Sequence, residues 1–545
     1  MTTYKDTQLN QIFRNVFLDN LHTPMFTDYG GATYTHEDAS KLICQLHEFF
    51  HLCNIQKGDK IALIGANTAH WGISFLAIMS YGAVVVPILP EFTAPDVMHI
   101  ITHSESKLVL AGDNQLAKLN LSETELVQAV VNITTLEGYW AKEEPYLNFW
   151  KGQHTSKKYT LDTLFTESFA DEEVGIISYT SGTSGFSKGV LLPYRSIKSN
   201  LIFARENMNL KAGYEILSFL PLAHVFGMIF DFLFPISEAC HITFLTKLPT
   251  PKVLVEAFGK IKPHLILSVP LIIEKIYFKQ VKPALDKPLM KLLLKTPLKH
   301  LLYKKLNQKL SAVFGGRFLE VVIGGAALNK EVEDFFRAIQ FPFSIGYGMT
   351  ECGPLISYKN WNATKASSSG AIVDRLEYRI DSPNHFQTPG EILIKGDNVM
   401  LGYYKNPEAT SNSIDADGWL HTGDLGITDA EHFIFIKGRS KNMLLGASGQ
   451  NIYPEEIEPR LSAEPFIAEC LLVQRDQKLV ALVYPDHEAL RLAKVPKAKI
   501  AQALDACRVN SNKHLAKYCQ IAELEIREEE FEKTPKKSIK RYLYS

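Results

Sequence analysis

The sequence predicts an α/β protein: a large N-terminal domain of stacked α/β sheets with a β-rich subdomain, then a small, mobile α+β domain. Three observations support this prediction. Short apolar runs that end in glycine or proline alternate with helical segments through the first half. Strand-like runs separated by turn residues follow from about residue 390. The chain has 545 residues, too many for one compact core at roughly 100–200 residues per domain.

The alternation is clearest near the N-terminus. The run KIALIG (60–65) is followed by a stretch that we expect to form an amphipathic helix (66–82), and then by AVVVPILP (83–90). Such a strand–helix–strand unit is typical of a mostly parallel sheet. Further strands are expected at GIISYT (175–180), HLILSV (264–269) and LEVVIG (319–324). Ligands bind at the carboxyl ends of strands in open α/β sheets, so the turns after these runs are candidate sites.

The second half divides near residue 440. EILIKG (391–396) and HFIFIKG (432–438) have the pattern of strands in a β-rich subdomain that begins at about Gly390. Pro454 then stands where the first residue of a helix is favoured. The run LLVQRDQKLVALVYP (471–485) predicts a hairpin that turns at Arg475–Gln477. We therefore expect an N-terminal domain at 1–437, a domain boundary at 438–441 and a C-terminal domain at 442–545.

Composition narrows the class of protein. The formal net charge is −1, so no overall attraction to nucleic acid is indicated. The seven cysteines are scattered without CxxC spacing, which favours a reducing compartment over a disulfide framework or a zinc site. The first fifteen residues lack the apolar core of a signal peptide, and charged residues interrupt the apolar stretch 228–246. We expect a cytoplasmic protein.

The turn SYTSGTSGFSKGV (178–190) is the strongest single feature. Its glycines let backbone N–H groups converge on an anion, its hydroxyls add donors, and Lys188 supplies positive charge. This combination is what a polyphosphate requires. It is not the Walker pattern, because Ser187 precedes the lysine and Gly189 follows it. The alternative is a flexible Gly/Ser linker, which would seldom follow an apolar strand.

Two other turns follow predicted strands. The run GYGMTE (346–351) ends in Thr350 and Glu351, a hydroxyl for phosphate and a carboxylate for a hard cation. The run GGAA (324–327) would let the backbone approach a flat ring closely. Alone, a Thr-Glu pair is more often the cap at the start of a helix, and the second run could be an ordinary strand-to-helix turn.

Taken together, these motifs resemble those of the adenylate-forming superfamily, which includes acyl-CoA synthetases and amino-acid adenylation domains. TSGTSGFSKGV (180–190) looks like its signature loop, and further matches are GWLHTGD (418–424), KGRSK (437–441) and GQNIYPEEIE (449–458). The matches run in order from about residue 30 to the C-terminus. The resemblance is closest to long-chain fatty acid–CoA ligases.

The resemblance implies roles for individual residues. For ATP, it implies binding by Thr180, Ser181, Gly182, Thr183, Ser184, Gly185, Lys188, Gly325, Ala326, Ala327, Gly346, Tyr347, Gly348, Thr350, Asp424, Arg439 and Gln450. Tyr347 would stack beside adenine, and Asp424 and Arg439 would hold the ribose. Glu351 and Thr183 would lie at a magnesium ion. His224, Gly325 and Gly348 would lie on the side of the acid substrate, although a lone histidine more often satisfies a local hydrogen bond.

The C-terminal motif of this superfamily departs here. The resemblance places a catalytic lysine where this chain has Ser538, aligned by Ile539 and Arg541. Lys536, Lys537 and Lys540 lie nearby, and we expect one of them to substitute, with Lys537 and Lys540 the candidate catalytic residues. The alternative is a solvated basic tail and slow adenylation.

The resemblance implies a two-step reaction with ATP, Mg²⁺ and coenzyme A. The carboxylate of a fatty acid would attack the α-phosphorus of ATP, and a thiol would then take the acyl group from the acyl-adenylate. Between the steps, the small domain would rotate about Lys441 and bring the loop at Gly449 to the site. Two alternatives stay open: a domain that loads an amino acid or aryl acid onto a carrier protein, with Asp231 as a faint ammonium ligand, and a nucleotide-binding homologue with weakened activity.

Residues 275–310 form a separate feature. They contain ten lysines and a single acid, Asp286, interleaved with Leu, Met and Tyr. A basic amphipathic stretch can rest on anionic lipid, which predicts peripheral contact with the inner face of a membrane. The alternative is a solvated face over a buried apolar stripe.

Overall fold

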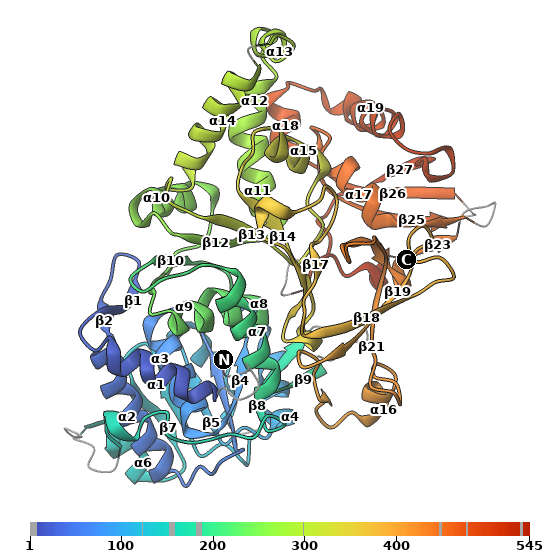
Figure 1. Cartoon of the computed structure of the whole chain (residues 1–545). Coiled ribbons are helices and arrows are strands. Elements are labelled where there is room, and N and C mark those ends of the chain that lie inside the picture. The colour runs from blue at the N-terminus through green and yellow to red at the C-terminus, as the bar shows by residue number, and fades with distance from the viewer. Residues whose placement is uncertain are drawn as a thin grey trace.

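The computed structural model describes residues 8–121, 124–151, 159–180, 188–297, 299–445, 450–475, 478–534 and 538–544. Within these ranges the chain is an α/β protein with two large sheets and a separate C-terminal sheet, as the sequence predicts (Figure 1). One continuous hydrophobic core extends from Leu9 to Ile434, and further clusters lie between Ile452 and Phe531.

The first large sheet contains the predicted strand–helix–strand unit. Its strands, in spatial order, are β20 (Gly402–Tyr403), β9 (Lys188–Pro193), β8 (Val174–Thr180), β4 (Val84–Ile88), β3 (Lys60–Ile64), β5 (Leu108–Ala111), β6 (Ala129–Asn132) and β7 (Glu137–Ala141). The central pairs from β8 to β6 are parallel, and the pairs at both edges are antiparallel. Its apolar runs are buried on both faces, as parallel strands require.

The second large sheet is parallel except at one edge. Its order is β14 (Phe343–Ile345), β13 (Glu320–Ile323), β12 (Leu265–Ser268), β10 (Glu215–Ser218), β11 (His241–Phe244), β1 (Pro24–Asp28) and β2 (Thr33–Thr35). The strands predicted at 264–269 and 319–324 are therefore neighbours, paired in parallel register.

The helix between β3 and β4 differs from the prediction. The stretch 66–82 forms α3 (Ala69–Tyr81), but all of its residues except His70 and Tyr81 are buried, so it is not amphipathic. It contacts β3 and β4 of one sheet and β1 of the other. A Cβ atom at Gly72 would lie 2.9 Å from the ring of Phe232, which shows how closely the layers approach. A helix packed between two sheets must be apolar all round.

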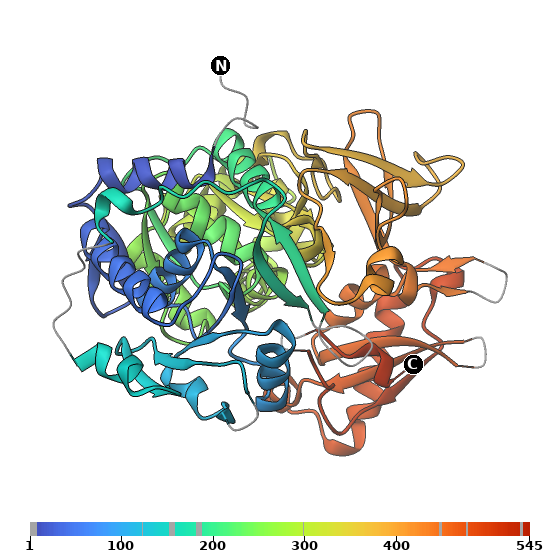
Figure 2. The same ribbon diagram turned by 90° about the horizontal axis from the view of Figure 1, so that it is seen from below.

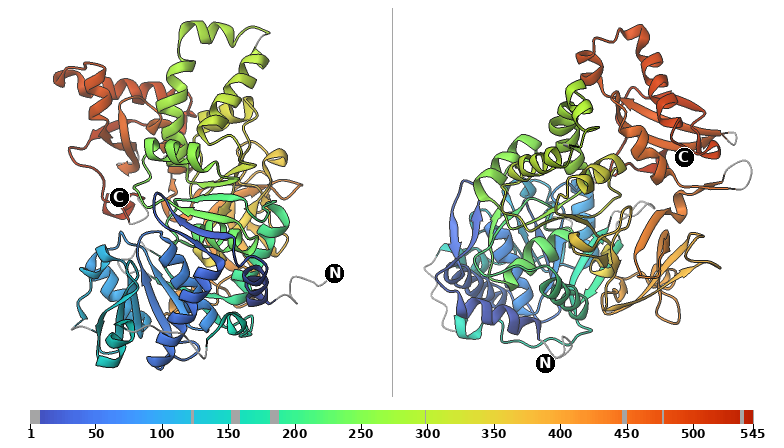
Figure 3. Two further views of the ribbon diagram at one scale, coloured as in Figure 1. Left: turned by 90° about the vertical axis from the view of Figure 1, so that its left-hand side faces the viewer. Right: turned by 45° about the horizontal axis from the view of Figure 1, so that its top comes forward.

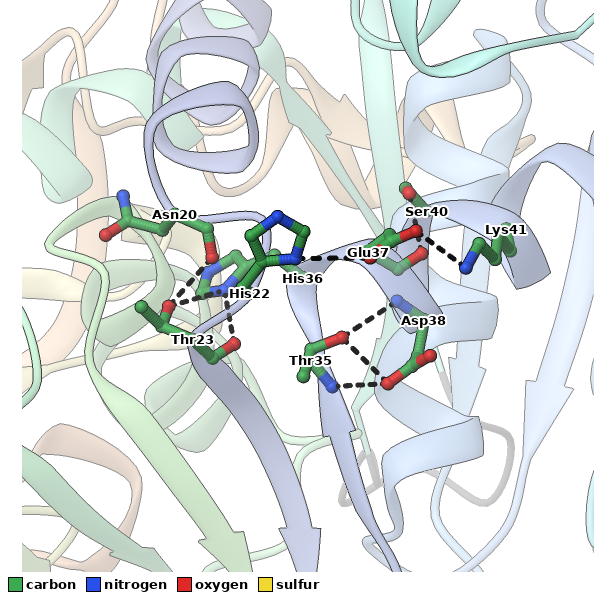
Figure 4. Close-up of polar contacts among 9 residues, drawn as sticks. All are labelled: Asn20, His22, Thr23, Thr35, His36, Glu37, Asp38, Ser40 and Lys41. Carbon is green, nitrogen blue, oxygen red and sulfur yellow. Dashed lines mark hydrogen bonds and ion pairs between the residues drawn. The ribbon is translucent and has the colours of Figure 1, made fainter.

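The other helices cover these sheets and connect their strands. They are α1 (Leu9–Asp19), α2 (His36–Leu52), α4 (Ala94–Ser104), α5 (Asp113–Leu116), α6 (Glu144–Asn148), α7 (Tyr194–Asn207), α8 (Val225–Met228), α9 (Phe234–Ser237), α10 (Pro251–Ile261), α11 (Pro270–Ile276), α12 (Lys282–Leu285), α13 (Pro288–Leu293), α14 (Lys299–Val313) and α15 (Lys330–Ala338). Helix α2 begins with a capping box, in which Thr35 and Asp38 bond each other's backbone N–H groups (Figure 4). The ion pair of Lys41 with Glu37 supports the same first turn.

The β-rich part begins before the predicted Gly390. Its antiparallel sheet is β18 (Leu376–Asp381), β19 (Gly390–Gly396), β21 (Leu420–Thr428) and β22 (Ile434–Arg439), joined by helix α16 (Pro407–Ser411). A small sheet precedes it: β15 (Tyr347–Gly348), β16 (Leu355–Tyr358) and β17 (Ala371–Ile372). Strand β18 (LEYRID) alternates apolar and polar residues, which is the pattern of a half-buried strand, so a strand signal is present before Gly390.

The C-terminal region forms its own layer of sheet and helices. Its strands are β23 (Leu444–Leu445), β24 (Asn451–Ile452), β25 (Ile467–Arg475), β26 (Lys478–Pro485) and β27 (Glu523–Ile526), and its helices are α17 (Pro454–Ser462), α18 (His487–Leu492) and α19 (Ile500–Asn512). Strands β25 and β26 pair as the predicted hairpin, and Pro454 is the first residue of α17. Figures 2 and 3 show this region, coloured orange-red to red, as a separate part beside the N-terminal sheets.

Within the described ranges, the structure contains no helix with the length and apolar character needed to cross a bilayer. The apolar segment 228–246 is divided among α8, a π-helical turn (Ile229–Leu233), α9 and β11.

Candidate functional site

The candidate site lies where several strands end. Gly324 follows β13 and donates a backbone hydrogen bond to Ser268 at the end of β12 (3.1 Å). Gly346 follows β14 and donates to Ile323 of β13 (2.9 Å). The turns that carry the GGAA and GYGMTE motifs therefore both lie at the carboxyl ends of strands in the second large sheet. Ligands bind at these strand ends in open α/β sheets.

Strands β8 and β9 flank the predicted phosphate-binding turn. They pair antiparallel, with Thr180 opposite Lys188. The turn residues Ser181, Gly182, Thr183, Ser184 and Gly185 lie outside the described residues. Strand β8 ends directly before these residues, and β9 begins after them, at Lys188.

A tyrosine connects Lys188 with Glu351. The Nζ atom of Lys188 lies 4.7 Å from the centre of the Tyr403 ring, and the Tyr403 hydroxyl donates a hydrogen bond to Oε1 of Glu351 (2.9 Å). Burial and the charge of Glu351 raise the pKa of Tyr403, so the hydroxyl stays a donor. The backbone also fixes Glu351, whose carbonyl accepts from the N–H of Met400 (2.9 Å). The predicted phosphate and cation residues thus belong to one cluster.

Thr350 is buried at the start of a short 3₁₀ helix (Thr350–Cys352). The preceding glycine is required sterically, because a Cβ atom at Gly348 would lie 2.1 Å from the carbonyl oxygen of Pro354. This carbonyl also accepts from the N–H of Met349 (2.9 Å). The close approach of the two chain segments fixes the direction in which Thr350 and Glu351 leave the strand.

A second cluster is centred on Asp424. Its Oδ2 atom accepts a hydrogen bond from the Tyr347 hydroxyl (2.7 Å), and its Oδ1 atom lies 2.8 Å from Nε of Arg439. Asp424 and Arg439 are direct neighbours on β21 and β22. Burial raises the pKa of Asp424, whereas Arg439 and the tyrosine hydrogen bond oppose this rise. The carboxylate is thus held in place by two donors.

The GGAA turn and His224 are the other predicted site residues of the N-terminal domain. Gly325 has a φ of +88°, which favours glycine, and Gly325, Ala326 and Ala327 are exposed after β13. His224 is partly buried as the cap of α8, and its Nδ1 accepts from the N–H of Phe226 (3.3 Å). This is the local hydrogen bond that a lone histidine commonly makes.

Asp231 is fully buried on the π-helical turn behind α8. Burial raises its pKa to about 7, and its Oδ2 atom has no hydrogen-bond partner among the described residues. A carboxyl group in this setting is neutral over much of the pH range below 7.

The C-terminal region contacts the site through helix α17. Asn442 donates a hydrogen bond to Glu455 of this helix (2.6 Å), and Lys437 lies 3.1 Å from Glu456. A longer-range bond joins the Asn329 side chain, at the start of α15, to the carbonyl of Pro459 (3.0 Å). Helix α17 therefore lies against both β22 and the segment that follows the GGAA turn.

The residues assigned to the hinge and the thiol step are exposed where the structure describes them. Lys441 lies in the 3₁₀ turn before β23 and Gln450 lies directly before β24, and both are exposed. Gly449 lies outside the described residues. The boundary predicted at 438–441 falls in the gap between the hydrophobic core that ends at Ile434 and the one that begins at Ile452.

The C-terminal tail is anchored by an arginine. Arg541 makes two hydrogen bonds to the Glu458 carboxylate (2.7 and 2.8 Å) and one to the carbonyl of Leu472 (3.0 Å). Lys540 lies 3.4 Å from Glu532, and Ser538 is exposed. Lys536 and Lys537 lie outside the described residues.

Comparison with known proteins identifies the family. The AMP-binding enzyme family matches residues 17–404, more than half of the chain. The chain belongs to the AMP-binding enzyme family. The strand ends described above, with the Asp424 and Glu351 clusters beside them, are the candidate nucleotide site of this family member.

Relatives of this AMP-binding enzyme include several acid–coenzyme A ligases. It is 28% identical to the long-chain-fatty-acid–CoA ligase heimdall of Drosophila melanogaster, over 89% of this chain and 75% of the relative. It is also 28% identical to 4-coumarate–CoA ligase 2 of Oryza sativa subsp. japonica, over 82% and 77% of the two chains. Its fold is similar to that of o-succinylbenzoate coenzyme A synthetase from Bacillus subtilis in complex with AMP, with a TM-score of 0.74, 19% identity and coverage of 98% and 97%.

The donor set of the AMP-binding enzyme fits a magnesium ion that arrives with a nucleotide. Among the described residues, no group of three or more His, Cys, Asp or Glu side chains could hold a metal ion. Glu351 offers one carboxylate, oriented by Tyr403. Mg²⁺ in nucleotide sites is commonly held by one or two carboxylates together with substrate phosphates, so this single carboxylate suffices.

Sequence reasoning missed two residues of this arrangement. Tyr403 lies in the segment GYYKNP, which has no recognisable motif, and it reaches the site because β20 pairs with β9. Asn329 contacts α17 only because the two domains meet. Both contacts depend on pairing between distant segments, so no local pattern could have revealed them.

Proposed function

We propose that this chain is an AMP-forming ligase that joins a fatty acid of medium or long chain to coenzyme A. The observation that carries the proposal is that residues 346–351 belong to both polar clusters: Tyr347 bonds Asp424, and Glu351 bonds Tyr403. This short segment thereby fixes the distance between the residues proposed to bind the ribose and those proposed to bind the phosphates.

In the first step, the carboxylate of the acid attacks the α-phosphorus of ATP, a new O–P bond forms, and pyrophosphate leaves. No general base is needed, because a carboxylic acid is ionised at neutral pH. Lys188 and the backbone N–H groups of the turn before it stabilise the charge on the phosphates. Asp424 accepts hydrogen bonds from the ribose hydroxyls, and Tyr347 and Arg439 hold its carboxylate in place.

A bound Mg²⁺ would be held by Glu351, with Thr183 nearby, and would neutralise charge on the departing pyrophosphate. Thr350 lies next to Glu351 and offers its hydroxyl to a phosphate oxygen. Tyr403 orients the Glu351 carboxylate before the nucleotide binds.

In the second step, a thiolate attacks the acyl carbonyl of the adenylate, a thioester forms, and AMP leaves. We propose that residues 442–545 rotate about 438–441, with Lys441 as the pivot, so that Gly449 and Gln450 approach the site. Contacts that such a rotation must break are the Asn329–Pro459 and Lys437–Glu456 interactions.

The choice of a fatty acid rests on the apolar segment near His224. Residues 225–236 are VFGMIFDFLFPI, and Phe226 lies against the turn after β13, where a Cβ atom at Gly324 would meet its ring at 3.1 Å. Phe226 is the one residue of this segment that is not buried, and an apolar ring beside this turn favours an acyl chain over a charged side chain. Because relatives include ligases named for fatty acids and for 4-coumarate, an aryl acid is the main competing substrate.

The proposal is tested by AMP release with purified protein, ATP, Mg²⁺ and coenzyme A. The acids supplied should be hexanoate, decanoate, palmitate, 4-coumarate and an amino-acid mixture. We expect kcat/KM to be at least tenfold higher for decanoate or palmitate than for 4-coumarate. A preference for 4-coumarate would refute the choice of acid, and activity only with a carrier protein would refute the acceptor.

Ser538 motivates a second candidate, a nucleotide-binding homologue with weakened activity. We propose instead that Lys536, Lys537 or Lys540 acts in the adenylation step. Replacing all three with alanine should lower acid-dependent pyrophosphate exchange by about 10²–10³ while leaving AMP affinity unchanged. An unchanged exchange rate would assign these lysines to a solvated tail.

A further inference from the structure

A helical arm projects from the N-terminal domain. It comprises residues 277–309: a π-helical turn (Tyr277–Val281), helices α12 and α13, and most of α14. Figure 1 shows α13 at the far end of this arm, away from both large sheets, and the left view of Figure 3 shows the same projection.

The arm has no buried core of its own. No described residue from 278 to 309 is buried, although many of them are apolar. Leu289 is 68% exposed, Leu292 63% and Leu301 63%. Helices α12 and α13 contain no buried residue at all, and α14 buries only Leu310, just beyond the arm. Exposed leucines gathered on one projection indicate a surface that meets another apolar phase.

The arm is also strongly basic. Residues 278–309 contain nine lysines and one acid, Asp286, in a chain whose net charge is −1. Lys282 pairs with Glu331 (2.8 Å) and Lys291 with Asp286 (3.0 Å). The other seven form no ion pair with any carboxylate of the described residues: Lys279, Lys287, Lys295, Lys299, Lys304, Lys305 and Lys309.

The alternative of a solvated face over an apolar stripe accounts for the apolar arm residues that are partly buried and pack against the main core: Phe278, Val281, Leu285, Tyr303 and Leu306. It does not account for Leu289, Leu292 and Leu301, which are all more than 60% exposed. We propose that the arm docks on an anionic lipid bilayer, with Leu289 and Leu292 in the interface and the unpaired lysines at the headgroups. A partner of this kind is favoured because it satisfies both properties at once: it accepts leucines and attracts a local excess of positive charge.

The base of the arm contacts the segment that follows the GGAA turn. Lys282 and Tyr277 both contact Glu331 in the first turn of α15, whose cap Asn329 contacts α17. Glu274, just before the arm, accepts a hydrogen bond from the N–H of Asn329 (2.8 Å). If the proposed fatty-acid function holds, docking would place the enzyme where such acids partition. The docking proposal itself does not depend on that function.

The test is co-sedimentation of the full chain with vesicles of phosphatidylcholine alone and of phosphatidylcholine with about one-third phosphatidylglycerol. We expect binding to the anionic vesicles that weakens as salt is raised, because exposed charges are screened. The triple variant Lys287→Glu, Lys295→Glu, Lys299→Glu should lose at least tenfold in binding. The double variant Leu289→Ser, Leu292→Ser should also bind at least fivefold more weakly.

Matched controls lie elsewhere on the surface. Lys494, Lys497 and Lys499 are exposed on the C-terminal region, and their replacement by glutamate changes the net charge equally. Leu248 is 81% exposed outside the arm and serves as the control for leucine. Both control variants should bind vesicles as the unmodified protein does. Thermal unfolding of every variant establishes that it is folded.

Three outcomes would overturn the proposal. The first is that the protein does not bind anionic vesicles. The second is that the arm variants and the control variants lose vesicle binding equally. The third is that the arm variants change oligomeric state, as measured by sedimentation velocity, while their vesicle binding is unaffected. The last result would assign the arm to contact between copies of the chain. Acid-dependent AMP release with decanoate, one of the acids that the proposed function favours, is measured in parallel without vesicles. Its failure would count against the proposed function and not against docking.

Discussion

The hydroxyl of Tyr347 lies 2.7 Å from Oδ2 of Asp424, a residue 77 positions further along the chain. Tyr347 follows β14, the last strand of the second large sheet in sequence, and Asp424 lies on β21 of the β-rich sheet. Their hydrogen bond therefore joins two layers of the N-terminal domain at the candidate nucleotide site. With Arg439 on the other oxygen of Asp424, it holds the carboxylate in one orientation before any ligand binds.

This relationship predicts graded effects on nucleotide affinity. Asp424→Asn should weaken AMP binding by about 10–100-fold, since hydrogen bonds to a charged group contribute roughly 1.5–3 kcal/mol. Tyr347→Phe should weaken it by about three- to tenfold, because the carboxylate stays but loses one donor. Isothermal titration calorimetry measures both, with Tyr378→Phe on β18 as the control. Equal affinities for all four proteins would mean that Asp424 does not contact the nucleotide.

Tyr403 is expected to act by positioning Glu351. Tyr403→Phe keeps the ring beside Lys188 but removes the hydrogen bond to the carboxylate. We expect kcat/KM for adenylation to fall about tenfold and the half-saturating Mg²⁺ concentration to rise. Tyr404→Phe is the matched control, since that hydroxyl bonds Glu105 (2.8 Å) away from the cluster. A Mg²⁺ dependence that does not change in Tyr403→Phe would contradict this role.

The pairing of Arg541 with Glu458 predicts a stability effect in the C-terminal region. Burial raises the pKa of Glu458, and Arg541 opposes this rise. Arg541→Ala leaves a mostly buried carboxylate unpaired, which should lower the free energy of unfolding by roughly 2–3 kcal/mol. The double variant Arg541→Ala, Glu458→Gln should recover at least half of this loss. Chemical denaturation followed by CD tests the prediction.

The control for this pair is Arg475→Ala, which removes an exposed ion pair with Glu525 and should change stability by less than about 0.5 kcal/mol. If Arg541→Ala and Arg475→Ala behave alike, the tail is not anchored as the structure shows.

Asp231 predicts a dependence of stability on pH. Its pKa is about 7 in the folded protein, above the ordinary value of 3.8. Between these values the folded state binds a proton that the unfolded state has released, so the free energy of unfolding falls as pH rises from about 4 to 7. Asp231→Asn removes this contribution and should be more stable than the unmodified chain at pH 8, by on the order of 2–4 kcal/mol.

Denaturation curves between pH 5 and 8 test this prediction, with the exposed residue Asp381 replaced by asparagine as the control. The difference between Asp231→Asn and the unmodified chain should grow with pH, whereas the control should show no trend. A constant difference at all pH values would mean that Asp231 is ionised throughout.

The sequence predicted those parts of the fold that have a local signal. Apolar runs that end at a glycine, a proline or a glycine-rich turn located β3, β8, β12 and β13, and Pro454 marked the start of α17. The start of the β-rich part was predicted too late, although β18 alternates apolar and polar residues as a half-buried strand does. The burial of α3 was not predicted either, since its surroundings depend on how two sheets stack.

The same limit applies to the site. Motifs in sequence predicted Lys188, Glu351, Asp424 and Arg439 as candidates, but not which of them contact one another. Tyr403 carries no motif, and it reaches Glu351 only because a two-residue strand pairs at the edge of a sheet. Contacts of this kind depend on tertiary packing, which local periodicity does not encode.

The most direct test of the central claim is exchange of labelled pyrophosphate into ATP, measured with the full chain, Mg²⁺ and no thiol. We expect exchange that requires a fatty acid and falls at least 100-fold in the double variant Lys188→Ala, Glu351→Gln. Exchange that is absent with every acid, or that this double variant leaves unchanged, would contradict adenylate formation at this site.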